Sequence, residues 1–397
     1  MESIRQIFRI GNGPSSSHTM APKRAAQIFA GRVDGASRFR VTLYGSLAAT
    51  GRGHMTDAAI LSVLEPIAPV EIVWKPETVL PYHPNGMFFE ALYGDTVLHR
   101  WTVFSIGGGA LGSEDASDAK LPDIYELSTI TDIQQWCDAN GSSYWEYVER
   151  CEGPDIWDYL AEVWRVMQQS VRRGLDAAGA IPGGLGIRRK AADYLIRAQG
   201  YSGTMKSRGM VYAYALAVSE ENATGGEIVT APTCGSSGVL PAVLYYLNES
   251  RVFPQSRILR ALATAGLFGD VVRTNASISG AEVGCQGEIG VACAMAAGAA
   301  CQLFGGSPGQ IEYAAEMGLE HHLGLTCDPV CGLVQIPCIE RNAFAAARAL
   351  DANTFSTFSD GKHRVSFDKV VEVMKQTGHD LPSLYKETAE GGLAKYL

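Results

Sequence analysis

The stretch EVGCQGEIGVACAMAAGAACQLF (282–304) gives the clearest indication of how this chain folds. Residues 289–306 carry no charge and consist mainly of Ala, Gly and Cys, which are small and only weakly apolar. The uncharged segment is almost long enough to span a membrane, but membrane spans are built from larger apolar side chains. We therefore predict a tightly packed helix that is buried inside a helical domain.

The sequence from about residue 155 onward has the same character as this stretch. Long Ala-rich segments are punctuated by glycine pairs, and strand signals are scarce. The first third differs, because β-rich segments predict strands at 38–44, 69–75 and 97–106, with a helix at 58–64.

These two patterns predict an α+β multidomain fold. A small α/β domain is expected at 1–148, followed by a larger all-helical domain at 149–397. The boundary is placed near residue 148 because the composition turns acidic and polar over 113–158.

Composition and charge limit the classes of function. The chain has 397 residues, a net charge of −9 and a pI of about 5.5, and it has no Lys/Arg-rich run. Proteins that bind nucleic acid or anionic membranes normally show the reverse charge balance, so neither partner is expected. The N-terminal residues lack the apolar core of a signal peptide, and we expect a soluble, cytoplasmic protein.

Nine cysteines are the main candidates for chemistry, and seven of them lie in the last 164 residues. An odd count without a signal peptide argues against a disulfide framework. Cys285, Cys327 and Cys338 lie in GAEVGCQGEIG, LTCDPVCG and QIPCIERN, where Gly and Pro allow a thiolate to turn inward. Three thiolates holding a four-iron cluster would leave one iron open for catalysis.

Two other interpretations of the cysteines remain open. Free Cys is often a small core residue, and this interpretation is favoured for Cys293 and Cys301 inside the Ala-rich helix. Zinc would normally need two C-x₂-C pairs, whereas only a C-x₃-C spacing occurs, at 327–331.

Serines and histidines of the first third form the second set of candidates. Ser15, Ser16, Ser17 and His18 precede a predicted helix, with Pro22 in its first turn and Gly31 at its end. A helix N-terminus with added hydroxyls can bind a carboxylate, although an ordinary N-cap beside a solvated loop explains the same residues.

His54 lies in a glycine-rich turn of LYGSLAATGRGHMTDAA (43–59). Its pKa near neutrality suits a general base, with Asp57 orienting it or capping a helix, while a structural role is the alternative. His321 and His322 either line a site near Cys327 or end a helix.

Two glycine-rich loops, IPGGLGIRR (181–189) and APTCGSSG (231–238), could bind an anion through backbone N–H groups. Neither has P-loop or dinucleotide spacing, so ATP and NAD are not indicated.

Taken together, these motifs resemble the iron–sulfur L-serine dehydratases over nearly the whole chain. The segments that carry the resemblance are GPSSSHTM (13–20), LYGSLAATGRGHMTDAAI (43–60), HPNGM (83–87), SIGGG (105–109), EENATGGEIVTAPT (220–233), GAEVGCQGEIGVA (280–292), HHLGLTCDPVCGLVQIPCIERNA (321–343) and VSFDKVVEVMKQTGHDLPSLYKETAEGGLA (365–394).

The resemblance implies a [4Fe–4S] cluster with one open iron site, held by Cys285, Cys327 and Cys338. It implies that His18 and His54 act at the active site, that L-serine is deaminated to pyruvate and ammonia, and that the chain forms a homodimer. We expect His54 to be the base, with His18 as an alternative base or an acid, and Ser15, Ser16 and Ser17 to hold the carboxylate.

The sequence departs from the family pattern in two places. Cys234 stands where many relatives have Asn, and 394–397 (AKYL) lacks the terminal cysteine that caps the open iron in some longer relatives. We expect water or a small anion to be the cap. The alternatives are a related lyase for L-threonine or L-cysteine, a pyridoxal phosphate dehydratase, which lacks a recognisable lysine here, and a cluster-based sensor.

Overall fold

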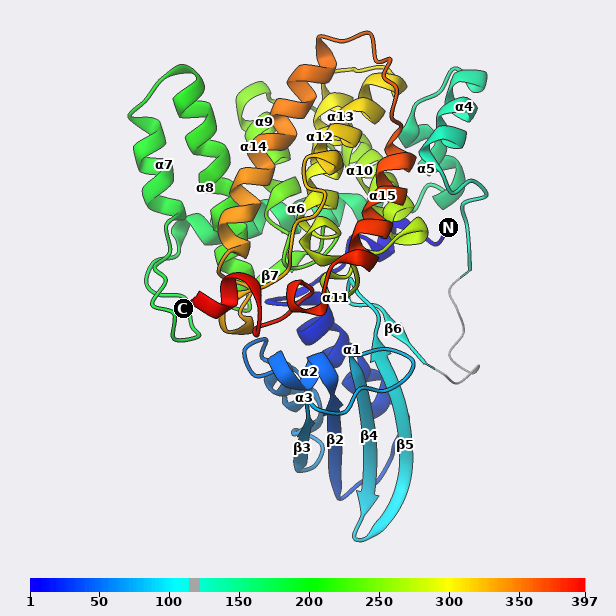
Figure 1. Cartoon of the computed structure of the whole chain (residues 1–397), viewed down its shortest axis with the longest axis vertical. Coiled ribbons are helices and arrows are strands. Elements are labelled where there is room, and N and C mark those ends of the chain that lie inside the picture. The colour runs from blue at the N-terminus through cyan, green and yellow to red at the C-terminus, as the bar shows by residue number, and fades with distance from the viewer. Residues whose placement is uncertain (114–121, 397) are drawn as a thin grey trace.

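The computed structural model describes residues 1–113 and 122–396, and it shows a small sheet domain below a larger helical body (Figure 1). This arrangement confirms the predicted α+β class. The acidic segment 114–120, part of the predicted boundary region, lies outside the described residues.

The small domain is built on a five-stranded mixed sheet with the order β3-β2-β4-β5-β6, in which only β2 and β3 are parallel. Three helices, α1, α2 and α3, accompany the sheet (Figure 1). The bounds are α1 Ala21–Ala30, β2 Arg38–Tyr44, α2 Gly45–Thr50, α3 Thr56–Leu64, β3 Val70–Lys75, β4 Gly86–Tyr93, β5 Thr96–Ser105 and β6 Leu111–Gly112.

The three predicted strands are confirmed to within one residue, and the helix predicted at 58–64 begins two residues earlier. Strand β4 was not predicted. It lies between β2 and β5 and is buried along most of its length, so its apolar residues do not alternate with polar ones. A strand covered on both faces gives no period-2 signal in the sequence.

The larger body is mostly helical in the described residues and contains the three-residue strand β7. Its elements are α4 Ile130–Asn140, α5 Tyr144–Glu152, α6 Ile156–Asp176, α7 Ala191–Gln199, α8 Gly203–Ala223, β7 Glu227–Val229, α9 Val239–Arg251, α10 Gln255–Asn275, α11 Gly280–Val283, α12 Ile289–Leu303, α13 Pro308–Glu320, α14 Cys338–Thr357 and α15 Phe367–Asp380.

Helix α12 is the centre of this body, as its composition predicts. It contacts α9, α10, α13 and α14, and nearly every one of its residues is buried. The neighbours approach so closely that a Cβ atom on Gly318 of α13 would lie 2.9 Å from the Cα atom of Ala294. Small residues are therefore required at this crossing.

No single helix of the described chain is long and apolar enough to cross a membrane. Only the pair Gly280–Gln286 and Ile289–Leu303, bent by 53°, passes the criteria of length and composition together.

The chain begins inside the larger body before it forms the small domain. Met1, Ile4, Ile7 and Phe8 pack in the helical core, and β1 (Ile10–Asn12) then pairs antiparallel with β7. Helices α4 and α5 also contribute to the larger core, whereas the separate core of the small domain lies within residues 25–103. The boundary near residue 148 stays a prediction.

Candidate active site

A buried pocket lies where the small domain meets the base of the helical body, and we call it the cysteine pocket. It brings together most of the residues singled out from the sequence. Its lining consists of Ser15, Ser16, His54, Gly235, Cys285, Glu288, Cys327, Pro329, Val334, Cys338 and Glu387. Ser17 and His18 stand directly beside this lining, because Ser15 Oγ lies 3.3 Å from Ser17 Oγ and the ring of His18 contacts that of His54.

The three cysteines reach the pocket from three different loops. Cys285 lies in the 3₁₀ turn Gly284–Gln286 before α12, Cys327 lies in the loop after α13, and Cys338 is the first residue of α14. The thiols of Cys285 and Cys327 and a carboxylate oxygen of Glu288 all lie within 4.8 Å of one another. Cys338 is not part of this close group, but it is buried like the other two cysteines and lines the same pocket.

The thiols perturb one another strongly. A hydrogen bond from Cys327 lowers the pKa of Cys285, and the same interaction together with burial raises the pKa of Cys327. Burial raises the pKa of Cys338. Arg341 interacts with the Cys285 thiol and donates a 2.6 Å hydrogen bond to the carbonyl of Thr326, which fixes a positive charge beside the thiols.

Gly280 leaves room for this arrangement. A Cβ atom at this position would lie 2.8 Å from Glu288 Oε2 and 3.1 Å from Cys327 Sγ. Any side chain here would displace the carboxylate or the thiol, which gives a physical reason for the glycine that opens GAEVGCQGEIG.

The two histidines come from adjacent turns of the small domain. His18 lies in the π-helical turn Ser16–Met20, and His54 lies just before α3. Their ring centroids are 4.6 Å apart, and neither side chain reaches solvent. Burial lowers the pKa of His18 to about 4. The pKa of His54 is well below its usual value, mainly because the ring is buried and also because two protonated imidazoles would repel each other. Both rings are therefore neutral at pH 7.

His54 has a free nitrogen. Within residues 1–113 and 122–396, its Nδ1 atom is buried and has no hydrogen-bond partner. Buried polar atoms of side chains are normally satisfied, so this nitrogen is available to a ligand in the pocket.

The serine run is held in place by the helical body. Asn222 at the end of α8 donates a 2.8 Å hydrogen bond to the carbonyl of Pro14, and a Cβ atom on Gly13 would lie 2.1 Å from its Oδ1 atom. Ser15 accepts a hydrogen bond from the N–H of His18 at 3.1 Å, so it caps the turn. Pro22 lies in the first turn of α1, and Gly31 follows its last residue, as predicted.

Two carboxyl groups of the pocket were not singled out from the sequence. Glu288 Oε1 accepts a 2.8 Å hydrogen bond from the hydroxyl of Thr233. Glu387 lies 3.4 Å from Nδ1 of His18 and 3.5 Å from Oγ of Ser17. Burial raises the pKa of each carboxyl to about 7. Both belong to segments that carry the family resemblance, which was the only available signal.

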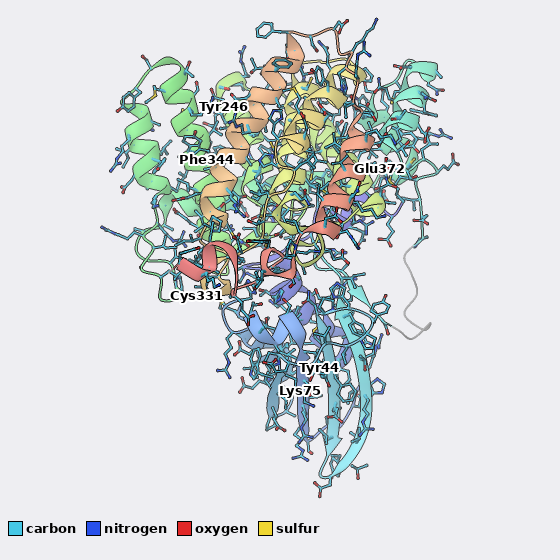
Figure 2. All side chains as sticks on the ribbon, in the orientation of Figure 1. Tyr44, Lys75, Tyr246, Cys331, Phe344 and Glu372 are labelled. Carbon is cyan, nitrogen blue, oxygen red and sulfur yellow. The ribbon has the colours of Figure 1, made fainter. Side chains whose placement is uncertain are left out.

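Other candidates lie away from this lining. His321 and His322 hydrogen-bond the carbonyls of Met317 and Gly318 at the end of α13, as expected for a polar helix end. Cys331 is exposed at the junction of the domains (Figure 2).

Cys293 and Cys301 are buried in α12, which agrees with a packing role. Cys234 is also buried, with its Sγ atom 3.7 Å from the sulfur of Met20.

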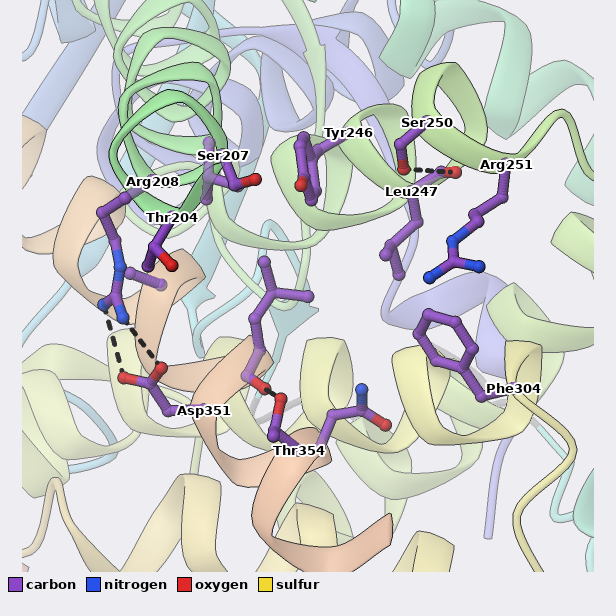
Figure 3. A pocket seen from close by; sticks show the side chains of 14 residues that line it. Thr204, Ser207, Arg208, Tyr246, Leu247, Ser250, Arg251, Phe304, Asp351 and Thr354 are labelled. Atoms are coloured by element: carbon purple, nitrogen blue, oxygen red, sulfur yellow. Dashed lines mark hydrogen bonds and ion pairs between the residues drawn. The ribbon is translucent and has the colours of Figure 1, made fainter. Parts of the chain in front are cut away.

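A separate groove between α8, α9 and α14 is lined by none of the candidate residues that the sequence indicated (Figure 3). The ion pair of Arg208 and Asp351, whose atoms are 2.9 Å apart, joins α8 to α14 at one side of this groove. The cysteine pocket, which combines thiols, imidazoles and carboxyl groups, is the site that has the composition of an enzyme active site.

Comparison with known proteins identifies the family of the chain. The family model described as serine dehydratase alpha chain matches residues 105–394, and the one described as serine dehydratase beta chain matches residues 3–72. The chain belongs to the serine dehydratase family, which confirms the resemblance inferred from the sequence.

Full-length relatives support the same conclusion. An L-serine dehydratase of Streptomyces coelicolor is 44% identical, with 99% of this chain and 98% of that protein covered. L-serine dehydratase 1 of Escherichia coli is 40% identical, with 99% of both chains covered. The Helicobacter pylori L-serine dehydratase is 35% identical, with 100% of this chain and 99% of that protein covered.

Proposed function

We propose that this chain is an L-serine dehydratase that deaminates L-serine to pyruvate and ammonia with the help of a [4Fe–4S] cluster. The observation that carries the proposal is that three thiols, two neutral imidazoles and a run of serine hydroxyls converge on one buried pocket. The names of the full-length relatives support L-serine as the substrate.

The residues of the pocket fit a cluster. Cys285, Cys327 and Cys338 would supply three soft ligands, and Gly280 leaves open the space beside the Cys327 thiol. When bound, a cluster with one open iron supplies a Lewis acid that stabilises negative charge on the departing hydroxyl oxygen.

The side chains of the chain itself account for the proton transfers. Hydroxyl groups of Ser15, Ser16 and Ser17 hold the substrate carboxylate near the N-terminal turn of the first helix. His54 is neutral and has a free nitrogen, so it can take the α-proton. His18, beside it, is the alternative base or a donor near the leaving oxygen.

The products follow from the atoms that leave. The α-proton and the β-hydroxyl depart as water and leave aminoacrylate. This enamine tautomerises to an imine, and hydrolysis with one water gives pyruvate and ammonium. We also propose that the enzyme is a cytoplasmic homodimer that acts in amino-acid degradation.

The decisive experiment is anaerobic purification, followed by quantitation of iron and acid-labile sulfide and by a pyruvate assay on L-serine. About four irons and four sulfides per chain, with turnover that is lost in air, are expected. If the purified chain contained no iron or sulfide and stayed active in air, the proposal that a cluster takes part in the reaction would be wrong. A panel with L-threonine and L-cysteine, measured by 2-oxo acid release, tests the substrate.

A further inference from the structure

Glu387 occupies an unusual position for an acidic side chain. It lies in the C-terminal segment, which crosses the base of the helical body beside the small domain (Figure 1). The side chain is only 12% exposed. In the described part of the chain, no ion pair joins it to Lys or Arg. Its partners are the hydroxyl of Ser17, the ring of His18 and the N–H of Ala281. A buried carboxylate without a cation is costly.

The backbone holds this side chain in place. The N–H of Cys327 donates to the carbonyl of Tyr385 at 2.8 Å, and the N–H of Thr388 donates to the carbonyl of Cys327 at 3.2 Å. Glu387 lies between these two anchors with a φ of 45°, a left-handed value that is rare for a residue other than glycine. Strained residues persist only where their surroundings fix them, and they concentrate at functional sites.

The rest of the pocket indicates which group of a substrate Glu387 would bind. His54 lines the same pocket as the thiols and has an unpartnered nitrogen, and the serine hydroxyls offer donors to an anion. Glu387 adjoins those hydroxyls, because its carboxylate oxygen lies 3.5 Å from Ser17 Oγ. An α-amino acid carries its carboxylate and its ammonium on one carbon, so the two binding sites must be neighbours.

We infer that Glu387 binds the α-ammonium group of the substrate and so selects amino acids over the corresponding hydroxy acids. This inference rests on the proposed function, since it assigns the one charged group of L-serine that the serines, histidines and cysteines leave without a partner. Glu288 lines the same pocket and is the second acidic group there, but its carboxylate contacts the Cys327 thiol at 3.7 Å.

The test is a comparison of two ligands that differ only in the charged nitrogen. L-alanine has the ammonium group, whereas L-lactate has a hydroxyl in its place, and neither is dehydrated. Binding of each is measured by calorimetry on anaerobic protein, and iron content is measured in parallel. The variants are Glu387→Gln, Glu387→Asp, which keeps the charge, and the control Glu390→Gln, which alters an exposed residue of the same segment.

The wild type and Glu390→Gln should prefer L-alanine. Glu387→Gln should lower the affinity for L-alanine by about tenfold or more, which is the usual loss for a hydrogen bond between charged groups. Its affinity for L-lactate should stay almost unchanged. Glu387→Asp should keep most of the preference. Three results would overturn the inference. The wild type could bind L-alanine no more tightly than L-lactate, Glu387→Gln could lose affinity for both ligands equally, or Glu387→Gln could still bind L-alanine more tightly than L-lactate.

Failure of the proposed function has a different signature. A protein that prefers L-alanine over L-lactate through Glu387 but releases no pyruvate from L-serine would contradict the dehydratase assignment and leave the ammonium site intact.

Discussion

The hydroxyl of Thr56 donates a 2.5 Å hydrogen bond to the carbonyl oxygen of His18. A matching bond of 2.7 Å runs from the hydroxyl of Thr19 to the carbonyl of His54. Each histidine turn is therefore hydrogen-bonded by a threonine from the other turn. These two reciprocal hydrogen bonds hold the turns side by side, with the imidazole centroids 4.6 Å apart.

Replacing Thr56 by Val keeps the shape of the side chain and removes the bond to His18. Because Thr56 is fully buried, the free energy of unfolding should fall by about 1–3 kcal/mol. Loss of ring alignment should also lower kcat on L-serine by about tenfold or more. Thermal unfolding and pyruvate release measure the two effects. The control Thr354→Val removes an exposed hydrogen bond from a hydroxyl to a carbonyl, and it should change neither the stability nor kcat. An unchanged kcat in Thr56→Val would contradict the role of the Thr56 hydrogen bond in aligning the rings.

His54→Ala tests the proposed base. General-base catalysis contributes about 10²–10⁴-fold to rate, so kcat should fall by that amount while iron and sulfide stay at the wild-type level. His321→Ala serves as the control, because this histidine is exposed at a helix end. Wild-type turnover in His54→Ala with a full complement of iron would exclude the residue as the base.

Ser substitutions at Cys285, Cys327 and Cys338 test the cluster ligands one at a time. Oxygen is a poor substitute for sulfur in binding iron clusters, so each variant should lose bound iron and pyruvate production together. The matched control is Cys331→Ser, which changes an exposed cysteine four residues from Cys327. A variant that keeps both iron and activity would remove that cysteine from the ligand set.

The pH dependence of kcat/KM reports on Glu387. Burial raises its pKa to about 7, so the carboxyl takes up a proton as the pH falls below that value and loses the charge that attracts an ammonium group. We expect kcat/KM for L-serine to fall below about pH 7. His18, with its pKa lowered to about 4, stays neutral in this range, and Glu288 is the other acidic group facing the pocket.

In Glu387→Gln, the fall in kcat/KM for L-serine below about pH 7 should be smaller than in the wild type. Profiles of the two proteins between pH 5 and 8 are compared after iron content has been matched. Superimposable profiles would show that Glu387 does not titrate in the free enzyme.

Gly392→Ala tests how the C-terminal segment is held. Gly392 has a φ of 55°, and a Cβ atom would lie 1.9 Å from Oδ2 of Asp328, which accepts a 2.8 Å hydrogen bond from the N–H of Leu393. The clash should release the segment and lower kcat/KM by about tenfold, since misplaced positioning groups cost this much or more. Gly305 also has a left-handed φ, so Gly305→Ala should cost a similar free energy of about 1–2 kcal/mol. Its added Cβ atom would contact no other atom, so this control variant should retain activity. Equal activity in both variants would contradict this role.

The sequence alone predicted most of the fold and much of the pocket. Helix α12 was predicted because a uniform run of small residues has few other stable uses, and β2 was predicted because β-rich residues end at a glycine turn. Strand β4 was missed because burial on both faces removes the alternation of apolar and polar residues.

The convergence of the candidate residues was not visible in the residues themselves. Nothing in local spacing shows that Ser15 and Cys327 line one pocket, because their proximity depends on how the two domains pack. Glu387 was missed for the same reason. An acid in a polar C-terminal segment has the sequence signature of a solvated residue, and only the pairing of its neighbours with Cys327 shows that it is buried.

The pocket takes one wall from residue 15 and another from residue 387, and this separation affects how the protein is made. Domains fold during translation from the N-terminal end, so the serine turn and the histidine turn can form early. The wall that carries Glu387 is made 372 residues after Ser15 and 49 residues after Cys338. Glu387 is therefore synthesised after all three thiols, and the pocket can be completed only once the segment that carries Glu387 has docked.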